Sequence, residues 1–282
     1  MSEALSIMFW PLIACLLLPG ILVYYGLHIV RREIIFVDLA LAQVAALGIC
    51  VSILLHHEPN SWQTYLLSLS FTFVGAAIFT WTRTQDHRVP QEALIGVVYV
   101  VAAAMAILLL SQSAEGDEEL KRTLVGDILL VQKKEVFLVF ALYVAIGLVH
   151  FAFRKQFLML TFEPERAARE KLSVRGWDFL FYALFGFVVT SFVRVGGVLM
   201  IFSYLIVPAV CANLLARSLR VKLLIGWLTA TLSSIAGLYA SYKMDLPTGA
   251  AIVCGLGAAL LLSALFAQFV FRHKATASSG PA

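Results

Sequence analysis

Nine stretches of the chain are apolar over about the 20 residues that an α-helix needs to cross a lipid bilayer. They comprise residues 6–28, 35–56, 63–82, 92–112, 135–153, 177–193, 196–215, 222–241 and 249–271. Only 13% of the residues are charged, whereas a soluble domain usually has about 25%. We therefore predict an all-α integral membrane protein, folded as a polytopic bundle of eight or nine transmembrane helices.

The stretch 194–222 combines a glycine pair, an apolar run and a basic end. The turn around Gly196 and Gly197 is short enough to be a re-entrant break, which leaves both eight and nine spans open. Pro208 lies inside the apolar run. Because proline lacks an N–H and clashes with the preceding turn, we expect this membrane helix to be broken or kinked there. The basic end is expected to reach the cytoplasm.

Most of the 21 Lys and Arg residues fall on one set of loop ends, which the positive-inside rule places in the cytoplasm. Nine spans then put the C-terminus inside and the N-terminus outside. We predict one transmembrane domain over residues 1–272 and a small, polar, disordered cytoplasmic tail over residues 273–282. An acidic cluster at 115–119, in an outer loop, is expected to be a solvated surface.

The sequence lacks the motifs of common catalytic sites. It contains no Gly-x-x-x-x-Gly-Lys-Ser/Thr phosphate loop, nucleophile elbow or His-Glu-x-x-His helix. We therefore expect that this chain neither hydrolyses ATP nor acts as an enzyme, and that it holds no cofactor. Its four cysteines lie in apolar runs, where we expect small buried side chains instead of disulfides or a metal cluster. A basic polar face for nucleic acid is also missing.

Polar side chains inside apolar stretches are costly, and they point to function by default. Asp38 and Gln43 lie in the second predicted span, Glu92 opens the fourth, and Asp245 precedes the last. Together they suggest a polar path that offers oxygen ligands to a cation. The alternative is that they cap helices, lie at the membrane interface or, for Gln43, join helices by hydrogen bonds.

Histidines supply a second group of candidate ligands. His56, His57 and Glu58 form an outer-loop trio that could meet a metal ion where it enters, because imidazole suits zinc-like ions. The alternative is a set of ordinary surface residues. His28 and His150 lie near span ends and are expected at the membrane interface.

Several motifs, in order along the chain, resemble one family. They are RREIIFVDLALAQVAALG (31–48), PQEALIGVVY (90–99), VGDILLV (125–131), FEPERAAREKLSVRG (162–176), RVGGVLMIFSYLIVPAVCANLLARSL (194–219) and SYKMDLPTGAAIV (241–253). By these motifs the chain is similar to the metal-ion permeases of ATP-binding-cassette (ABC) importers, the membrane subunits of zinc and manganese uptake systems.

The resemblance implies partners and a location. A homodimer with a path between its subunits, two cytoplasmic ATP-binding subunits and an extracytoplasmic metal-binding protein are expected, in a bacterial inner (plasma) membrane. A cytoplasmic coupling helix would map to about 211–222. Its expected contacts with the ATPase are Leu214, Leu215, Arg217, Leu219 and Arg220. A short surface helix at 163–175, beginning at Pro164 and ending before Gly176, is the second candidate.

One departure from the family concerns the cargo. The family carries an Asp and a His four residues apart, and these positions correspond to Leu39 and Gln43 here. Asp38 stands one place earlier, about 100° around the helix. We therefore expect a permease for a divalent metal ion, zinc or manganese first, with a metal chelate or another small nutrient as the alternative cargo. A membrane scaffold without transport is a third possibility, and a secondary transporter is disfavoured because inverted repeats are not detectable.

Overall fold

The computed structural model describes residues 3–59, 61–82, 90–111, 126 and 128–278, and these residues contain helices but no strand. The helices in chain order are α1 (Glu3–Arg32), α2 (Val37–Leu54), α3 (Trp62–Trp81), α4 (Gln91–Leu110), the 3₁₀ helix η1 (Ile128–Leu130), α6 (Lys133–Ala152), α7 (Arg154–Phe162), α8 (Pro164–Arg169), α9 (Val174–Leu215), α10 (Leu219–Met244) and α11 (Thr248–Ser278). The predicted acidic cluster at 115–119 lies outside the described residues.

Nine helical segments of the described chain are long and apolar enough to cross a membrane, which agrees with the larger of the two predicted numbers. The segments on either side of Arg194, Val174–Val193 and Val195–Leu215, are each long and apolar enough to cross. Their lengths favour two spans over a re-entrant break. The prediction of an all-α, polytopic membrane protein is confirmed.

Helix α9 is interrupted at Gly197, and not at Pro208 as the sequence suggested. Gly197 has φ 72° and ψ 170°, and it has the one non-helical backbone conformation within α9. A positive φ of this kind costs glycine little, because glycine has no Cβ. Proline removes one backbone hydrogen bond, and the helix continues through Pro208 despite that loss.

The segment just before η1 packs directly on this interruption. Gly126 has φ 69°, and a Cβ added to it would lie 2.1 Å from the carbonyl carbon of Gly196. Only a residue without a side chain can approach the backbone so closely. Two glycine-bearing motifs, 125–131 and 194–219, thus meet at the end of the bundle that we predict to be outside.

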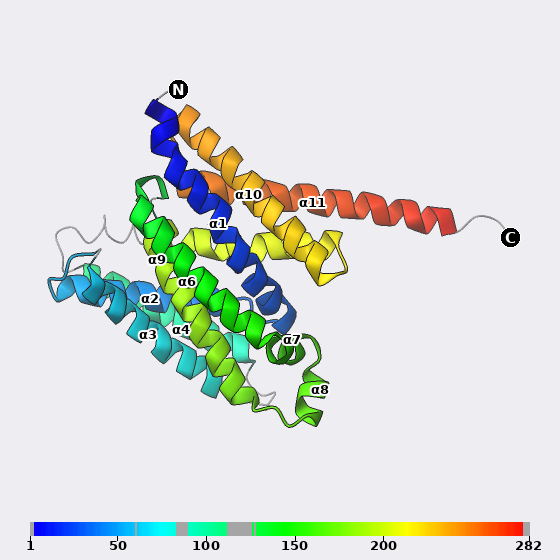
Figure 1. Ribbon diagram of the computed structural model, residues 1–282, viewed down its shortest axis with the longest axis horizontal. Helices are drawn as coiled ribbons and strands as arrows, with labels where there is room; N and C mark the ends of the chain where they lie inside the picture. Colours follow the sequence, from blue (N-terminus) through cyan, green and yellow to red (C-terminus); the bar gives the residue numbers. More distant parts are fainter. Residues whose placement is uncertain (1–2, 60, 83–89, 112–125, 127, 279–282) are drawn as a thin grey trace.

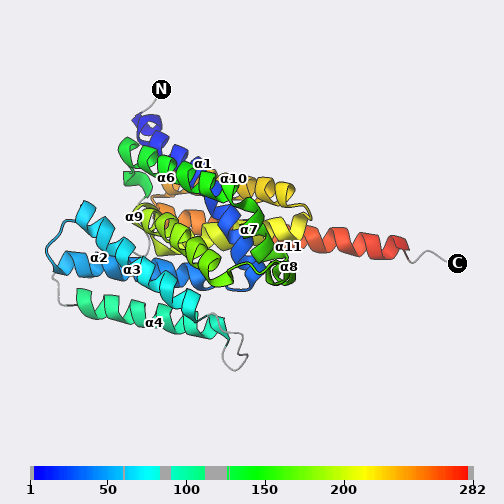
Figure 2. The same ribbon diagram turned by 60° about the horizontal axis from the view of Figure 1, so that its bottom comes forward.

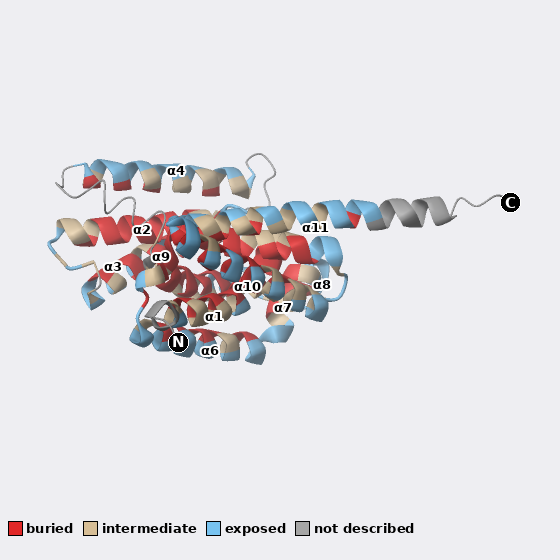
Figure 3. Ribbon diagram, turned by 90° about the horizontal axis from the view of Figure 1, so that it is seen from above, coloured by how far each residue is buried: buried red, intermediate tan, exposed pale blue. Residues whose placement is uncertain are grey.

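Helix α9 forms the centre of the bundle and packs against α1, α2, α3, α10 and α11 (Figure 1). Helix α2 is the most enclosed, since 78% of its most apolar window is buried, compared with 22% for α4 and 17% for α11. Figure 2 shows α4 as an outer layer beyond α2 and α3, and Figure 3 shows how little of it is buried. The apolar faces of α4 and α11 are thus left for lipid or for another chain.

Two predicted surface helices differ from the structure. The segment 163–175 contains only the short helix α8, which begins at Pro164 as predicted, and Gly176 lies in the first turn of α9. The segment 211–222 is not a separate helix. It forms the end of α9, an extended residue at Ala216, and the start of α10. Helix α11 continues to Ser278, well into the predicted disordered tail, and residues 279–282 lie outside the described part.

The closest contact between α1 and α9 depends on one glycine. A Cβ added to Gly26 would lie 1.9 Å from the carbonyl oxygen of Leu205 and 3.2 Å from the Cβ of Ala209. Small residues let membrane helices approach closely where lipid provides no hydrophobic driving force between them. Gly20, on the same helix, has nothing within 4 Å of its added Cβ.

We therefore expect Gly26→Ala to destabilise the protein by about 1–3 kcal/mol, the usual cost of overpacking a well-packed interior. Gly20→Ala is the matched control and should leave stability unchanged. Thermal unfolding of the purified protein in detergent, followed by circular dichroism, measures both. An equal loss of stability in the two variants would contradict the contact between α1 and α9.

Candidate functional site

The buried carboxylate of Asp38 is the most unusual group in the central helix α2. Its side chain is fully buried, and Oδ1 accepts a 2.8 Å hydrogen bond from the backbone N–H of Leu39. Its other oxygen, Oδ2, is buried without a hydrogen-bond partner. A buried carboxylate oxygen that lacks a partner is costly, so this group can accept a proton, a cation or a donor from another molecule.

The predicted partner, Gln43, is also buried, but it does not share a helix face with Asp38. Five residues separate the two, which places their side chains about 140° apart around α2 and about 7.5 Å apart along it. Leu39 instead faces a cavity of about 470 Å³ between α2 and α4, together with Gly96 and Tyr99. The side chains of Asp38 and Gln43 therefore do not form one pair of ligands for a single ion within this chain.

The other two predicted path residues lie at opposite ends of the bundle. Glu92 is half-buried in the first turn of α4, at the end from which α2 also starts. Asp245 is exposed at the C-cap of α10, with a left-handed φ of 51°, at the other end. The four residues Asp38, Gln43, Glu92 and Asp245 are therefore not gathered into one site.

The outer-loop trio is partly engaged in local structure. Nδ1 of His57 lies 3.1 Å from the hydroxyl of Ser52, and the carbonyl of Glu58 accepts a hydrogen bond from Thr64. His56 has a left-handed φ of 62°. Over the described residues, three or more His, Cys, Asp or Glu side chains do not come together in a way that could hold a metal ion. A role for the trio where metal enters stays a prediction.

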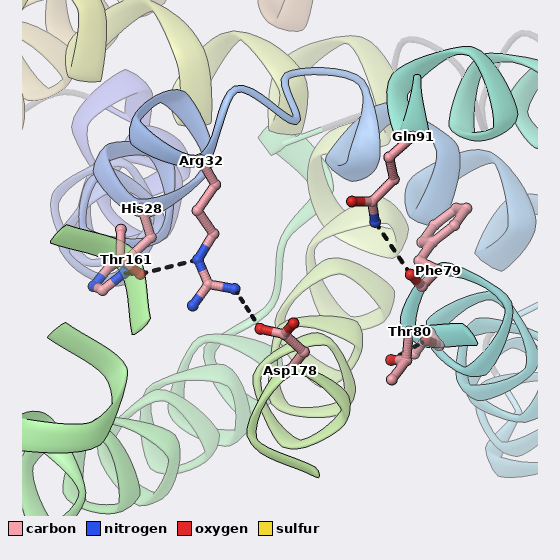
Figure 4. Close-up of polar contacts among 8 residues, drawn as sticks. His28, Arg32, Phe79, Thr80, Gln91, Thr161 and Asp178 are labelled. Carbon is pink, nitrogen blue, oxygen red and sulfur yellow. Dashed lines mark hydrogen bonds and ion pairs between the residues drawn. The ribbon is translucent and has the colours of Figure 1, made fainter. Parts of the chain in front are cut away.

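A buried polar network that the sequence did not predict joins α1, α7 and α9 (Figure 4). Nη1 of Arg32 forms a 2.9 Å ion pair with Asp178, and both side chains are at most 5% exposed. Nε of Arg32 donates to the hydroxyl of Thr161 at 2.9 Å, and Nδ1 of His28 lies 2.6 Å from the same hydroxyl. The network ties the end of α1 to the end of α7 and to the start of α9.

A second unpredicted contact lies deeper between α1 and α6. Nε2 of His150 is 2.7 Å from the hydroxyl of Tyr25, Nδ1 is 3.1 Å from that of Tyr24, and the imidazole stacks on Phe157. His28 and His150, expected at the membrane interface, are therefore buried. The sequence showed only that these two histidines lie near the ends of spans. It did not predict which tyrosine or threonine hydroxyls they contact.

Both candidate coupling segments line one cleft of about 520 Å³ at the predicted cytoplasmic end. Arg217, Leu219 and Lys222 come from the corner between α9 and α10, whereas Glu163 precedes α8. Leu214, Leu215, Arg217 and Arg220 are exposed, and Leu219 is half-buried. On the other side, Arg166 of α8 forms ion pairs with Glu163 at 3.0 Å and with Glu170 at 2.9 Å.

Comparisons with known proteins agree on one family. The model of the ABC 3 transport family matches residues 4–267. Among curated proteins, the chain is 28% identical to the manganese transport system membrane protein MntC of Listeria innocua, over 74% of this chain and 76% of that one. It is 25% identical to the manganese import system permease protein ScaB of Streptococcus gordonii, over 81% and 80%.

Solved structures show the same fold. PsaBC from Streptococcus pneumoniae in complex with Fab matches with a TM-score of 0.78 and 23% identity, over 93% of each chain. An inward-facing conformation of a putative metal-chelate type ABC transporter matches with a TM-score of 0.69 and 17% identity, over 96% of this chain and 91% of that one.

The buried ion pair between Arg32 and Asp178 generates a prediction about stability. Asp178→Ala leaves a guanidinium buried without its partner, and we expect a loss of about 3–5 kcal/mol. Replacing both partners, with Arg32→Met and Asp178→Leu, should recover much of that loss, because apolar pairs often substitute for buried ion pairs. Glu170→Gln, in an exposed pair, should change stability by less than about 1 kcal/mol.

Thermal denaturation in detergent measures the stability of these three variants and of the wild type. A loss in Asp178→Ala as small as that in Glu170→Gln would contradict the buried pair.

Proposed function

The chain belongs to the ABC 3 transport family, and from this premise we propose that it carries a divalent metal ion into the cytoplasm, with manganese favoured over zinc. It is the membrane permease subunit of an ABC metal import system and not a catalytic subunit, as the motifs predicted. ATP is hydrolysed by separate partner chains. The chain itself needs no cofactor, and the metal is its cargo.

The observation that carries the choice of cargo is the buried carboxylate of Asp38 with its unsatisfied oxygen. Carboxylate and amide oxygens suit manganese, whereas imidazole and thiolate suit zinc. By the motif resemblance, Gln43 stands where related permeases have a histidine, so the two proposed path residues of the second span offer carboxylate and amide oxygens. The names of the relatives MntC and ScaB, both of manganese systems, support the same choice.

We place the path along α2, between the enclosed centre of the bundle and α4. The incoming ion would contact Gln43 first and then bind Asp38, one to two turns nearer the inner end, where Glu92 would receive it. Asp245 and the trio His56, His57 and Glu58 lie at the outer end, where the ion enters. They act in succession, which is consistent with their separation in the structure.

A second copy of the chain would complete this path. The apolar helices α4 and α11 are buried only slightly within one subunit, and the α2–α4 cavity opens beside α4. A homodimer that covers these faces, two cytoplasmic ATP-binding subunits and an extracytoplasmic metal-binding protein make the proposed assembly. It lies in a bacterial inner (plasma) membrane with its C-terminus in the cytoplasm.

The ATPase is proposed to act on the corner between α9 and α10. Leu214, Leu215, Arg217, Leu219 and Arg220 are the proposed contacts, and α8 is the second candidate. From this corner α9 runs back to its interruption at Gly197, where the outer loop packs. ATP binding would then favour one arrangement of the outer end and hydrolysis the other, because the contacts differ between the two states.

The alternative cargo is a metal chelate or another small nutrient. Two observations favour it: the missing imidazole at position 43, and the lack of a three-ligand cluster among the described residues. A chelate brings its own ligands, so it requires fewer from the protein.

Reconstitution with the ATPase and the binding protein distinguishes these cargoes. We expect ATP-dependent uptake of manganese into proteoliposomes, and Asp38→Ala should reduce it about tenfold or more, because losing a charged partner costs at least about 1.5 kcal/mol. Glu33→Gln, at an exposed carboxylate nearby, is the control and should transport normally. Assembly and ATP hydrolysis without uptake of any free ion would reject the metal-ion proposal in favour of a chelate.

Charge reversal tests the coupling surface. Arg220→Glu, at the exposed corner, should weaken co-purification of the ATPase and lower ATP-dependent uptake, whereas Lys155→Glu, exposed at the start of α7, should not. Arg169→Glu examines α8 in the same assay. If Arg169→Glu alone releases the ATPase, then α8 and not the corner is the coupling element.

A further inference from the structure

Two cavities adjoin near the cytoplasmic end of α1. The first is an open groove of about 440 Å³ between α1 and α6, within the membrane span. The second is the cleft of about 520 Å³ that the corner between α9 and α10 forms with α1, α7 and the segment before α8. Leu158 and Leu219 line both cavities, so the groove leads into the cleft.

The groove is apolar and hollow. Its walls include Ile21, Phe140 and Val144. Each helix also contributes one glycine to the lining, Gly20 on α1 and Gly147 on α6. A Cβ added to either glycine would have nothing within 4 Å. The two helices therefore leave a channel on the surface that faces the hydrocarbon of the bilayer.

The cleft is basic, in contrast to the groove. Arg31, Arg217 and Lys222 line it, and Arg154 lies at the adjoining end of the groove. Within the described part of the chain, none of these four cations forms an ion pair with a carboxylate. Glu163 also lines the cleft, but its carboxylate pairs with Arg166, and hydrogen bonds to Glu163 and Glu170 raise the pKa of Arg166.

We propose that the groove and the cleft together bind one anionic phospholipid from the cytoplasmic leaflet. An acyl chain lies between α1 and α6, and the phosphate lies among the cations. From Gly20 to Arg31 the helix rises about 16 Å, which matches the hydrocarbon depth of one leaflet, about 15 Å. Basic pockets between membrane helices on the cytoplasmic side are suited to anionic headgroups.

The physical setting favours a lipid over the other occupants. An ATPase approaches from water and would contact Leu214, Leu215 and Arg220, which line neither cavity, and only the outer edge of the cleft at Arg217 and Leu219; it could not reach the groove within the span. A soluble anion could satisfy the cations but would leave the apolar groove empty. A lipid satisfies both, and it would brace α1 and α6 against the corner that we propose to couple ATP hydrolysis to transport.

Native mass spectrometry of the purified permease in detergent, with added phosphatidylglycerol or phosphatidylcholine, tests the proposal. One set of substitutions tests the basic cleft, and another tests the apolar groove. Arg31→Gln with Lys222→Gln removes charge from the cleft, and Gly147→Leu fills the groove where space is open. Lys155→Gln and Gly257→Leu are matched controls, since Lys155 is exposed outside both cavities and the added Cβ of Gly257 also meets nothing within 4 Å.

We expect one phosphatidylglycerol to bind more tightly than phosphatidylcholine. The double charge variant should weaken it about thirtyfold, since each basic residue near an anionic headgroup contributes a factor of about five. Gly147→Leu should remove this bound lipid, and both controls should keep it.

Three results would overturn the proposal. The first is a failure of the expected selectivity: phosphatidylglycerol and phosphatidylcholine bind equally, or phosphatidylglycerol still binds both to Gly147→Leu and to the double charge variant. The second is displacement of the lipid by glycerol 3-phosphate at the same concentration as by phosphatidylglycerol, which would mean a phosphate site without an acyl chain. The third is a change of oligomeric state in Gly147→Leu, which would mean that a second copy of the chain covers the groove.

Discussion

Polar groups inside the bilayer have no water to bind, so their partners must lie within the protein. Several hydroxyls of the spans meet this requirement locally. The hydroxyls of Thr72, Thr80 and Ser234 donate to the backbone carbonyl four residues earlier in their own helix. Larger groups need partners on other helices, as Arg32 does in Asp178. These long-range contacts fix the positions of α1, α7 and α9 relative to one another.

The same requirement makes exceptions informative. Five buried side-chain atoms of the described residues lack a hydrogen-bond partner, and Oδ2 of Asp38, in the first turn of α2, is the one carboxylate oxygen among these five. The unpaired cations Arg31, Arg217 and Lys222 are a milder exception, because water reaches the cleft. In our two proposals, the metal cargo binds the carboxylate of Asp38, and an anionic phospholipid binds the three cations of the cleft.

Glycine and proline affect the backbone of the central helix α9 differently. The sequence drew attention to Pro208, yet a proline costs one hydrogen bond that the surrounding helices tolerate, and α9 stays helical there. Gly197 adopts a non-helical conformation that kinks α9, and Gly126 approaches the glycine pair more closely than a residue with a side chain could. The glycine pair was visible in the sequence, but its contact with a loop 70 residues earlier was not.

The sequence by itself determined that the chain is a membrane protein of eight or nine spans, and its motifs indicated the family. A span depends on the apolarity of about 20 consecutive residues, and a motif on their order, so both are local properties. Only the tertiary structure decided which polar groups meet. His28 and Thr161 lie 133 residues apart, and no local pattern in either segment predicts that their side chains meet. It also separated Asp38, Gln43, Glu92 and Asp245, and it merged the expected coupling helix into a corner, because helix packing sets where a side chain points and where a helix can end.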